Sequence, residues 1–256
     1  MTGRPGRAVL PVGGHESVPA EAIGPGRGLR TALADRPRAV AVPMTLGRDP
    51  DLAPSAAQTL AFAARDRAPG DLLLAEPLGT VTHLVGWIRA AVLRLARTTG
   101  FAGAVLLVAP AAGPDADAEL FKVARLVWDG LPARPVEVAL DGGEPDPAEG
   151  AERCRRLGAG EVALVPASFV PPPAVPGTVP AGPLLQPAAV EALVRERAAA
   201  AERRWERDGD DGLGAAHGHG HGHGHGHGHG HSHSHHHHEF LGITETTLEG
   251  AAAHGG

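Results

Sequence analysis

The sequence predicts an α/β protein with parallel sheets, followed by a tail that has no globular pattern. Short apolar runs that end in Gly or Pro alternate with longer stretches of helical period, which is typical of parallel strands joined by helices. Residues 217–240, HGHGHGHGHGHGHGHSHSHHHHEF, hold thirteen of the sixteen histidines of the chain. The 256 residues are enough for one large domain or two of ordinary size.

Six apolar runs predict the strands of the sheets. We expect strands at Ala8–Val12, Ala39–Val42, Asp71–Ala75, Ala104–Val108, Val136–Leu140 and Glu161–Val165. We expect helices at Leu52–Arg65, Thr82–Arg97, Asp117–Asp129, Pro147–Leu157 and Pro187–Asp208. A helix between two strands carries the chain back across the sheet, so this order predicts parallel pairing.

The two halves of the chain contain three pairs of similar segments. These are AVLPVGGHES with AVLLVAPAAG, AVAVPMTLG with EVALVPASF, and LAEPLGTVTHLVGWIRAA with PAGPLLQPAAVEALVRER. They align Val12 with Val108, Pro43 with Pro166 and Pro77 with Pro183, at offsets of 96, 123 and 106 residues. The growth from the first offset to the second equals about one strand and one helix. Either a duplication whose first half lacks one strand–helix unit or ordinary convergence of α/β patterns produces such matches.

Charge and cysteine content exclude several classes of function. The formal net charge is −6 and no run of Lys or Arg occurs, so we expect no nucleic-acid partner. The single cysteine, Cys154, supports neither an intramolecular disulfide nor a cysteine-based zinc site, which favours the cytoplasm. The N-terminal apolar run is too short for a signal peptide, and Arg89 and Arg94 interrupt the most apolar helix. We therefore expect neither export nor a membrane span.

The histidine-rich segment predicts binding of divalent metal ions. Imidazoles at every second residue, separated by Gly, can surround such an ion in many equivalent ways. The candidate ligands are His217, His219, His221, His223, His225, His227, His229, His231, His233, His235, His236, His237 and His238. Neutral imidazole is the ligand, so binding should weaken below about pH 6.5. We expect residues 209–256 to be disordered without metal. A purification tag and a low-complexity tract without function are the alternatives.

The segment GAVLLVAPAAGPDADAELFKVARLVWDG, with VEVALDGGEPDPAEGAERCRRLGAGEVALVPASFV, resembles the second half of a class II chelatase. This family comprises the sirohydrochlorin cobaltochelatases and ferrochelatases of cobalamin and sirohaem synthesis. The first half is similar at VLPVGGHES and at AVAVPMTLGRDPDLAPSAAQTL. The resemblance implies two chelatase-like, flavodoxin-like lobes at residues 1–100 and 101–208, the first of them abbreviated, with residues 209–256 as the tail.

The resemblance also implies a reaction: insertion of a divalent metal, most simply Co²⁺ but also Ni²⁺ or Fe²⁺, into a sirohydrochlorin-type tetrapyrrole without ATP. The metal and the macrocycle are the substrates, and the macrocycle would lie at the carboxyl ends of the strands. His15 matches the strand-end histidine that holds the metal and helps to accept pyrrole protons. A neutral imidazole suits both tasks. The alternative is a loop histidine without a ligand.

The chain departs from the family pattern at four points. One residue is inserted before His15, and Glu16 follows it where the family has Gly. Arg48 and Asp49 stand where the family has its second metal-facing histidine. The strand that carries the catalytic glutamate of the family has no counterpart in the first half.

Two residues of the segment AEPLGTVTHLVG are candidate substitutes. Glu76 could accept the protons, and His83 could be a second metal ligand, because both follow the next strand. Alternatively, His83 is an ordinary residue of a helix start that Thr80 or Thr82 caps. Three acidic residues could line the opposite lip of the cleft or only favour a helix N-terminus; these are Asp115, Asp117 and Glu119.

The missing ligands leave a second hypothesis, a chelatase fold without catalysis that acts as a cobalt or nickel reservoir or metallochaperone. We find no GxxxxGK[ST] phosphate loop and no GxSxG elbow that would favour another class of enzyme.

Overall fold

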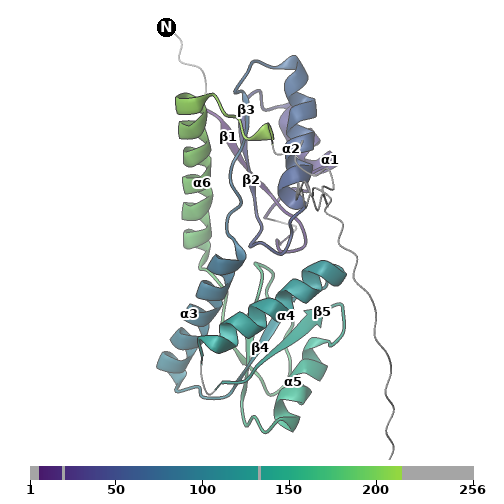
Figure 1. Cartoon of the computed structure of the whole chain (residues 1–256), viewed down its shortest axis with the longest axis vertical. Coiled ribbons are helices and arrows are strands. Elements are labelled where there is room, and N and C mark those ends of the chain that lie inside the picture. The colour runs from purple at the N-terminus through teal and green to yellow at the C-terminus, as the bar shows by residue number, and fades with distance from the viewer. Residues whose placement is uncertain (1–5, 19–20, 132–133, 215–256) are drawn as a thin grey trace, which may run out of the picture. The chain divides into compact units, whose positions relative to one another are not determined.

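A computed structural model describes residues 6–18, 21–131 and 134–214. All of them belong to one compact unit, residues 1–219. The predicted disorder is wrong for residues 209–214, because the Asp211 carbonyl accepts the N–H of Leu74 at 2.9 Å and Leu213 packs in the core of the first half. The rest of the predicted tail, with its thirteen candidate ligands, lies outside the described residues. Within the described part, two parallel sheets and six α-helices confirm the predicted α/β class (Figure 1).

The first sheet has three parallel strands in the order β1-β2-β3. The strands are β1 (Ala8–Val12), β2 (Ala39–Pro43) and β3 (Leu72–Leu74). Its connections contain α1 (Arg27–Ala34), α2 (Leu52–Ala63) and a 3-10 turn, η1 (Ala64–Asp66). We did not predict α1, whose buried Leu29 and Leu33 are too few to give a helical period within a Gly- and Pro-rich stretch.

The second sheet has four parallel strands in the order β5-β4-β6-β7. The strands are β4 (Ala104–Pro110), β5 (Val136–Asp141), β6 (Val162–Pro166) and β7 (Val179–Pro180). The remaining helices are α3 (Val81–Thr99), α4 (Pro114–Asp129), α5 (Pro147–Arg156) and α6 (Pro187–Asp208). The two-residue β7 escaped prediction because it is shorter than any apolar run that signals a strand.

The sequence repeat coincides with a repeat in strand register. The facing residues are Val12 with Pro43 and Ala41 with Leu74 in the first sheet, and Val108 with Pro166 and Leu164 with Pro180 in the second. Each residue of the second sheet in these pairs is removed from its counterpart in the first sheet by the offset of its aligned segment, 96, 123 or 106 residues. The three matched segments therefore form three equivalent strands, β1, β2 and β3 in one sheet and β4, β6 and β7 in the other.

The first sheet lacks the strand–helix unit that the offsets predict to be missing. In the second sheet β5 pairs with β4 along the whole of β5. On the corresponding side of β1, the described residues contribute a single bridge between Val12 and Ile23. Its counterpart in the second sheet is the pairing of Val108 with Ala139. The N-terminal half is thus shorter by one strand, and its β1 is left as an edge strand.

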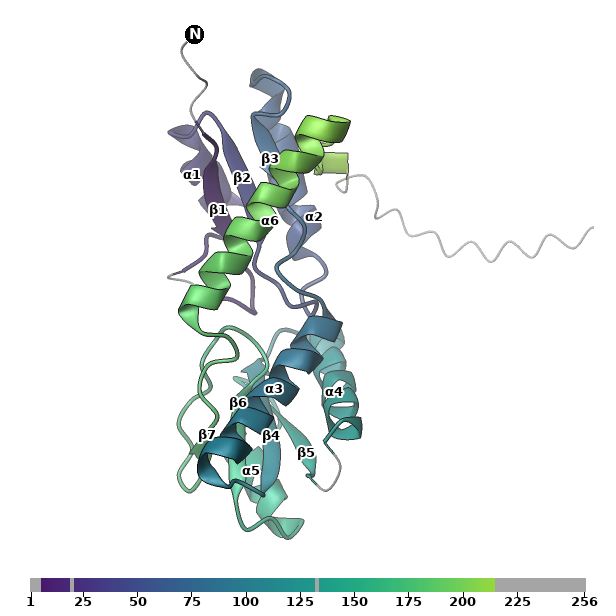
Figure 2. The ribbon, with the colours of Figure 1, turned by 90° about the vertical axis from the view of Figure 1, so that its left-hand side faces the viewer.

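The helices that end the two halves exchange places. Leu84 and Ile88 of α3 pack in one cluster with Val105 and Val165 of the second sheet. The last helix, α6, packs against Val40, Val42 and other residues of the first sheet. Figure 2 shows α6 lying across β1–β3 and α3 lying across β4, β6 and β7. The expected lobes, residues 1–100 and 101–208, assign α3 to the first sheet and α6 to the second. In the structure each of these helices covers the sheet of the other half.

Replacing Gly70 by Ala should destabilise the protein by about 2 kcal/mol or more. Gly70 has a φ of +76°, and an added Cβ would lie 2.1 Å from the ring of Trp205, which packs α6 against the first sheet. Gly24→Ala is the control, since nothing lies within 4 Å of its Cβ position. Urea unfolding of both variants measures the difference. Equal stabilities would contradict the docking of α6 through Trp205.

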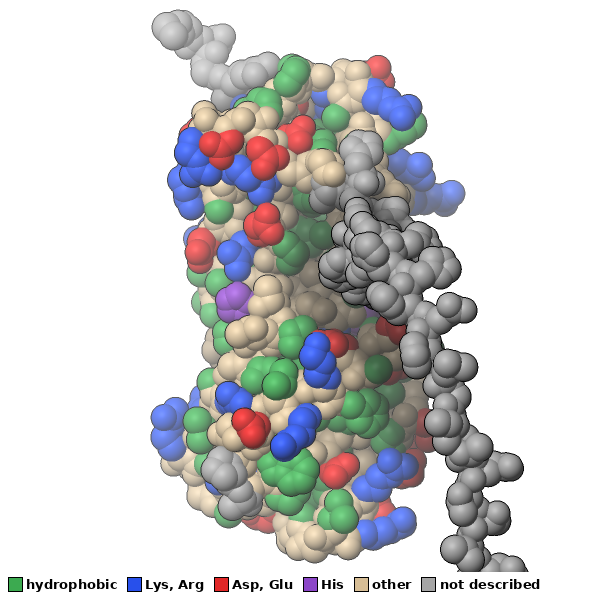
Figure 3. Space-filling model, viewed as in Figure 1, with side chains coloured by type: hydrophobic (Ala, Val, Ile, Leu, Met, Phe, Trp, Pro, Cys, Tyr) green, Lys and Arg blue, Asp and Glu red, His purple; other side chains and the backbone are tan. Residues whose placement is uncertain are grey.

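No helix in the described ranges is long and apolar enough to cross a membrane. On the face that Figure 3 shows, basic and acidic side chains are interspersed with apolar ones.

Candidate functional site

The turn after β1 and the loop after β2 bring five residues together at the carboxyl ends of the strands. We call them the strand-end cluster: His15, Glu16, Thr45, Arg48 and Asp49. Four buried side-chain atoms of this cluster have no hydrogen-bond partner among the described residues: His15 Nε2, Glu16 Oε1 and both terminal nitrogens of Arg48. Buried polar atoms are rarely left without partners, so such a concentration marks a place that a bound group or water completes.

His15 lies where the sequence predicts it, in the turn after β1. Its Nδ1 atom faces Asp49 Oδ2 at 3.4 Å, and 21 % of the side chain is exposed. The opposite ring nitrogen, Nε2, is buried without a partner. His15 thus has a carboxylate beside Nδ1 and a ring nitrogen without a hydrogen-bond partner at Nε2. Because Nε2 is buried, a metal ion can bind it only after the surrounding side chains move.

Glu16 is fully buried, which the residues around it in the sequence do not predict. One carboxylate oxygen accepts hydrogen bonds from the Thr45 hydroxyl and, at 2.9 Å, from the Leu46 N–H. Burial raises the pKa of the Glu16 carboxyl above its ordinary value, while these hydrogen bonds and the charge of Arg48 oppose the rise. The Glu16 carbonyl accepts the N–H of Phe169, which follows β6, at 2.9 Å. Glu16 thus ties β1 to β2 and to the second half.

The stability of the protein should depend on the ionisation of Glu16. Because its folded-state pKa is raised above the ordinary value of 4.5, the folded state is favoured when Glu16 is protonated. This contribution is complete below 4.5 and is lost as the pH rises through the folded-state pKa. The glutamine of Glu16→Gln cannot ionise. As the pH rises, the wild type should therefore lose stability relative to Glu16→Gln.

Urea unfolding at several pH values measures this difference. Glu76→Gln is the matched control, because the Glu76 side chain is 73 % exposed. A difference between Glu16→Gln and wild type that does not change with pH would contradict the raised pKa.

Arg48 extends from the first half to the start of α4. Its Nε donates to the Ala116 carbonyl at 3.2 Å, and its Nη2 lies 3.7 Å from Asp117 Oδ1. Its side chain is wholly buried, and burial lowers the pKa of the guanidinium while the charge of Glu16 opposes this. Arg48 therefore connects the loop after β2 with the start of α4.

The acidic residues of α4 have structural partners or solvent around them. Asp117 accepts the N–H of Ala112 at 3.1 Å and pairs with Arg48, as a residue at a helix start does. Glu119 binds Lys122 at 3.0 Å, and Asp115 is exposed. These contacts favour the helix-start interpretation of the three residues over the lining of a cleft.

Glu76 and His83 do not join His15 in a metal site. Glu76 pairs with Arg204 of α6 at 3.4 Å and is largely exposed. His83 Nδ1 accepts the N–H of Thr80 at 3.2 Å in a capping box at the start of α3. Within residues 6–18, 21–131 and 134–214, no group of three or more His, Cys, Asp or Glu side chains could hold a metal ion. The sequence-based assignment of these two residues to one site with His15 is not supported.

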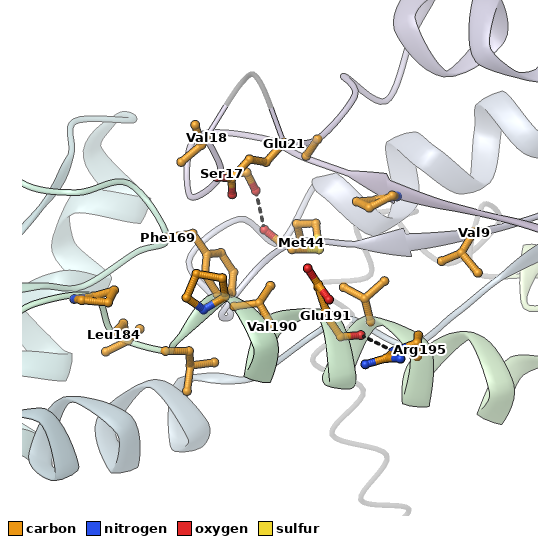
Figure 4. Close-up of a pocket in the computed structure, with 16 residues that line it drawn as sticks. Val9, Ser17, Val18, Glu21, Met44, Phe169, Leu184, Val190, Glu191 and Arg195 are labelled. Atoms are coloured by element: carbon orange, nitrogen blue, oxygen red, sulfur yellow. Dashed lines mark hydrogen bonds between the residues drawn. The ribbon is translucent and has the colours of Figure 1, made fainter.

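A cavity of about 720 Å³ lies beside the strand-end cluster, between β1 and α6. Apolar side chains form most of its wall, and Glu21, Glu191 and Arg195 stand among them (Figure 4). Val9 and Pro11 of β1 line it, and their counterparts in the second half are Val105 and Leu107, which α3 and α4 cover. The cavity is thus the space that a missing helix leaves, which explains its apolar wall without a ligand.

Comparisons with known proteins add no assignment to this geometry. No protein-family model matches the chain, and no curated protein matches its sequence.

Proposed function

We propose that the chain inserts a divalent metal ion, most simply Co²⁺, into a sirohydrochlorin-type tetrapyrrole. The observation that supports this proposal most is His15, a strand-end imidazole that faces a carboxylate through Nδ1 and has an unpartnered Nε2. Histidines that bind metals in proteins commonly have a carboxylate or a carbonyl beside the ring nitrogen that does not bind the metal.

The repeated strand register supports a two-lobed chelatase-like architecture. The two sheets have equivalent strand pairs. Arg48, in the loop at the carboxyl end of β2, donates a hydrogen bond to the Ala116 carbonyl at the start of α4. Ligands of open α/β sheets bind at this end of the strands. In the proposed reaction the divalent metal ion replaces the two N–H protons of the macrocycle. His15 contacts the incoming ion first, and once the ion has passed to the macrocycle the freed imidazole nitrogen takes up one of the two protons, while the other leaves to solvent. The tail raises the local concentration of metal.

The proposal is tested by the rate at which Co²⁺ enters sirohydrochlorin. The absorption spectrum of the macrocycle is followed in the presence and in the absence of the full chain, at the same free Co²⁺ concentration. We expect the full chain to accelerate insertion, and equal rates would contradict catalysis.

A second function, storage or delivery of cobalt or nickel without catalysis, is favoured by a separate observation. Glu76 and His83 have structural surroundings, and the described residues contain no three-ligand group. The thirteen closely spaced histidines of the tail would then be the metal-binding part of the protein. Titration with Co²⁺ in the absence of tetrapyrrole would give several bound ions per chain under either function, so the insertion rate decides between them.

A further inference from the structure

The cavity between β1 and α6 contains two carboxylates that the missing helix does not explain. Glu21 follows β1 and Glu191 belongs to α6, and both line the cavity, with Glu191 extending into it from the helix (Figure 4). Neither side chain forms an ion pair or a hydrogen bond with another described residue. Arg195 supplies the positive charge among the lining residues. Two carboxylates against one guanidinium leave the apolar cavity with an excess of negative charge, which favours an occupant that brings a cation.

The internal repeat shows what covers the same surface in the second half. The offset of 106 residues pairs Leu84 and Ile88 of α3 with Val190 and Val194 of α6. Leu84 and Ile88 are fully buried in one cluster with the apolar residues of α4, a helix that α3 contacts. Val190 and Val194 line the cavity instead. A helix placed as α4 is would cover both valines, which favours a helix over other shapes of occupant.

The same alignment pairs Arg89 of α3 with Arg195 of α6. Arg89 donates to the carbonyl of Leu126 in the last turn of α4. Arg195 donates through Nε to the carbonyl of Glu191 at 3.3 Å, and its terminal nitrogens have no partner among the described residues. The last carbonyls of a helix lack partners within the helix. Arg195 therefore has free donors where its counterpart binds the end of a helix.

One aligned position differs in character between the two halves. Val85 of α3, buried in the cluster that includes α4, corresponds to Glu191 of α6. An apolar side chain laid against the Glu191 carboxylate would remove its hydration without compensation. A basic side chain at this point avoids that cost. The occupant of the cavity should therefore differ from α4 by a positive charge at the border of its apolar stripe.

We propose that the cavity between β1 and α6 binds an amphipathic helix of a partner protein that carries Lys or Arg beside its apolar stripe. The stripe covers Val190 and Val194, the basic side chain pairs with Glu191, and Arg195 donates to carbonyls of the last turn. Recognition of this kind is the binding of a helix in an apolar groove. His15 does not line the cavity, so helix binding and metal insertion are tested separately.

The test uses two synthetic amphipathic helices that share one leucine stripe, the first with Lys beside the stripe and the second with Glu. The fluorescence anisotropy of each labelled peptide is followed as the full chain is added, with a chelator present so that metal on the tail does not contribute. We expect the Lys peptide to bind about tenfold more tightly than the Glu peptide. Glu191→Lys should weaken binding of the Lys peptide by about tenfold, because it replaces attraction by repulsion.

Glu196→Lys is the matched control, because it makes the same change of charge on α6 at an exposed residue that does not line the cavity. It should leave the affinity within about twofold, since solvent and salt screen its charge. Arg195→Ala should weaken binding of both peptides, because it removes the donors to the last turn.

Three results would overturn the proposal. The first is no binding of the Lys peptide or equal affinity for the two peptides. The second is an equal effect of Glu191→Lys and Glu196→Lys, because the charge of the whole protein would then explain the binding. The third is self-association of the free chain, measured by sedimentation, that Glu191→Lys abolishes, because a second copy would then fill the cavity.

Discussion

His15→Ala should lower the rate of Co²⁺ insertion into sirohydrochlorin by about 100-fold or more, because it removes a metal-contacting group and not a support of one. The change should leave the fold intact, since the side chain is 21 % exposed and belongs to none of the apolar clusters. The measurement is the initial rate at saturating Co²⁺, so that delivery of metal by the tail does not limit it. Thermal unfolding of the variant checks that its structure is retained.

His83→Ala is the matched control, because His83 is exposed and occupied as a capping residue of α3. It should cost about 1 kcal/mol of stability or less, as the loss of a cap does, and leave the insertion rate unchanged. A His15→Ala variant as active as the wild type would contradict the site. A His83→Ala variant that is inactive but folded would restore His83 as a metal ligand.

Removal of residues 217–256 should abolish most of the metal binding of the chain. The deleted segment carries fourteen of the sixteen histidines, and the described residues contain no three-ligand group that could replace them. Titration with Co²⁺ should show several ions bound to the full chain and at most a single weak one bound to the shortened chain.

The same truncation separates delivery from catalysis. At limiting Co²⁺ the shortened chain should insert metal more slowly than the full chain, and at saturating Co²⁺ the two rates should agree. A shortened chain that is inactive at saturating Co²⁺ would contradict the division of labour between body and tail.

The strands were predictable because each of six is a short apolar run between Gly and Pro residues, and burial of both faces of a parallel sheet gives such runs. The repeat was predictable for the same reason, since equivalent strands need similar residues. The exchange of α3 and α6 was not. An amphipathic helix has the same apolar face whichever sheet it covers, so its sequence does not indicate which of the two sheets it packs against.

The candidate site was predictable only where the chain itself sets the position. His15 is in the turn that follows β1, so its place near the strand end follows from the sequence. Glu76 also follows a strand, but it pairs with Arg204 of α6, a helix whose docking on this sheet arises only in three dimensions. Glu16 and Asp49 belong to the cluster through contacts with Thr45 and Gly14, which no spacing in the sequence reveals.

The number of tetrapyrrole molecules metallated by each molecule of the full chain tests the central claim most directly. The chain is supplied at low concentration with buffered Co²⁺ and an excess of sirohydrochlorin, and product is measured above that of the protein-free reaction. Catalysis at His15 predicts many products per chain, about ten or more within the assay, with continued turnover. Product that never exceeds the protein-free reaction, or that stops at the amount of metal preloaded on the tail, would contradict it.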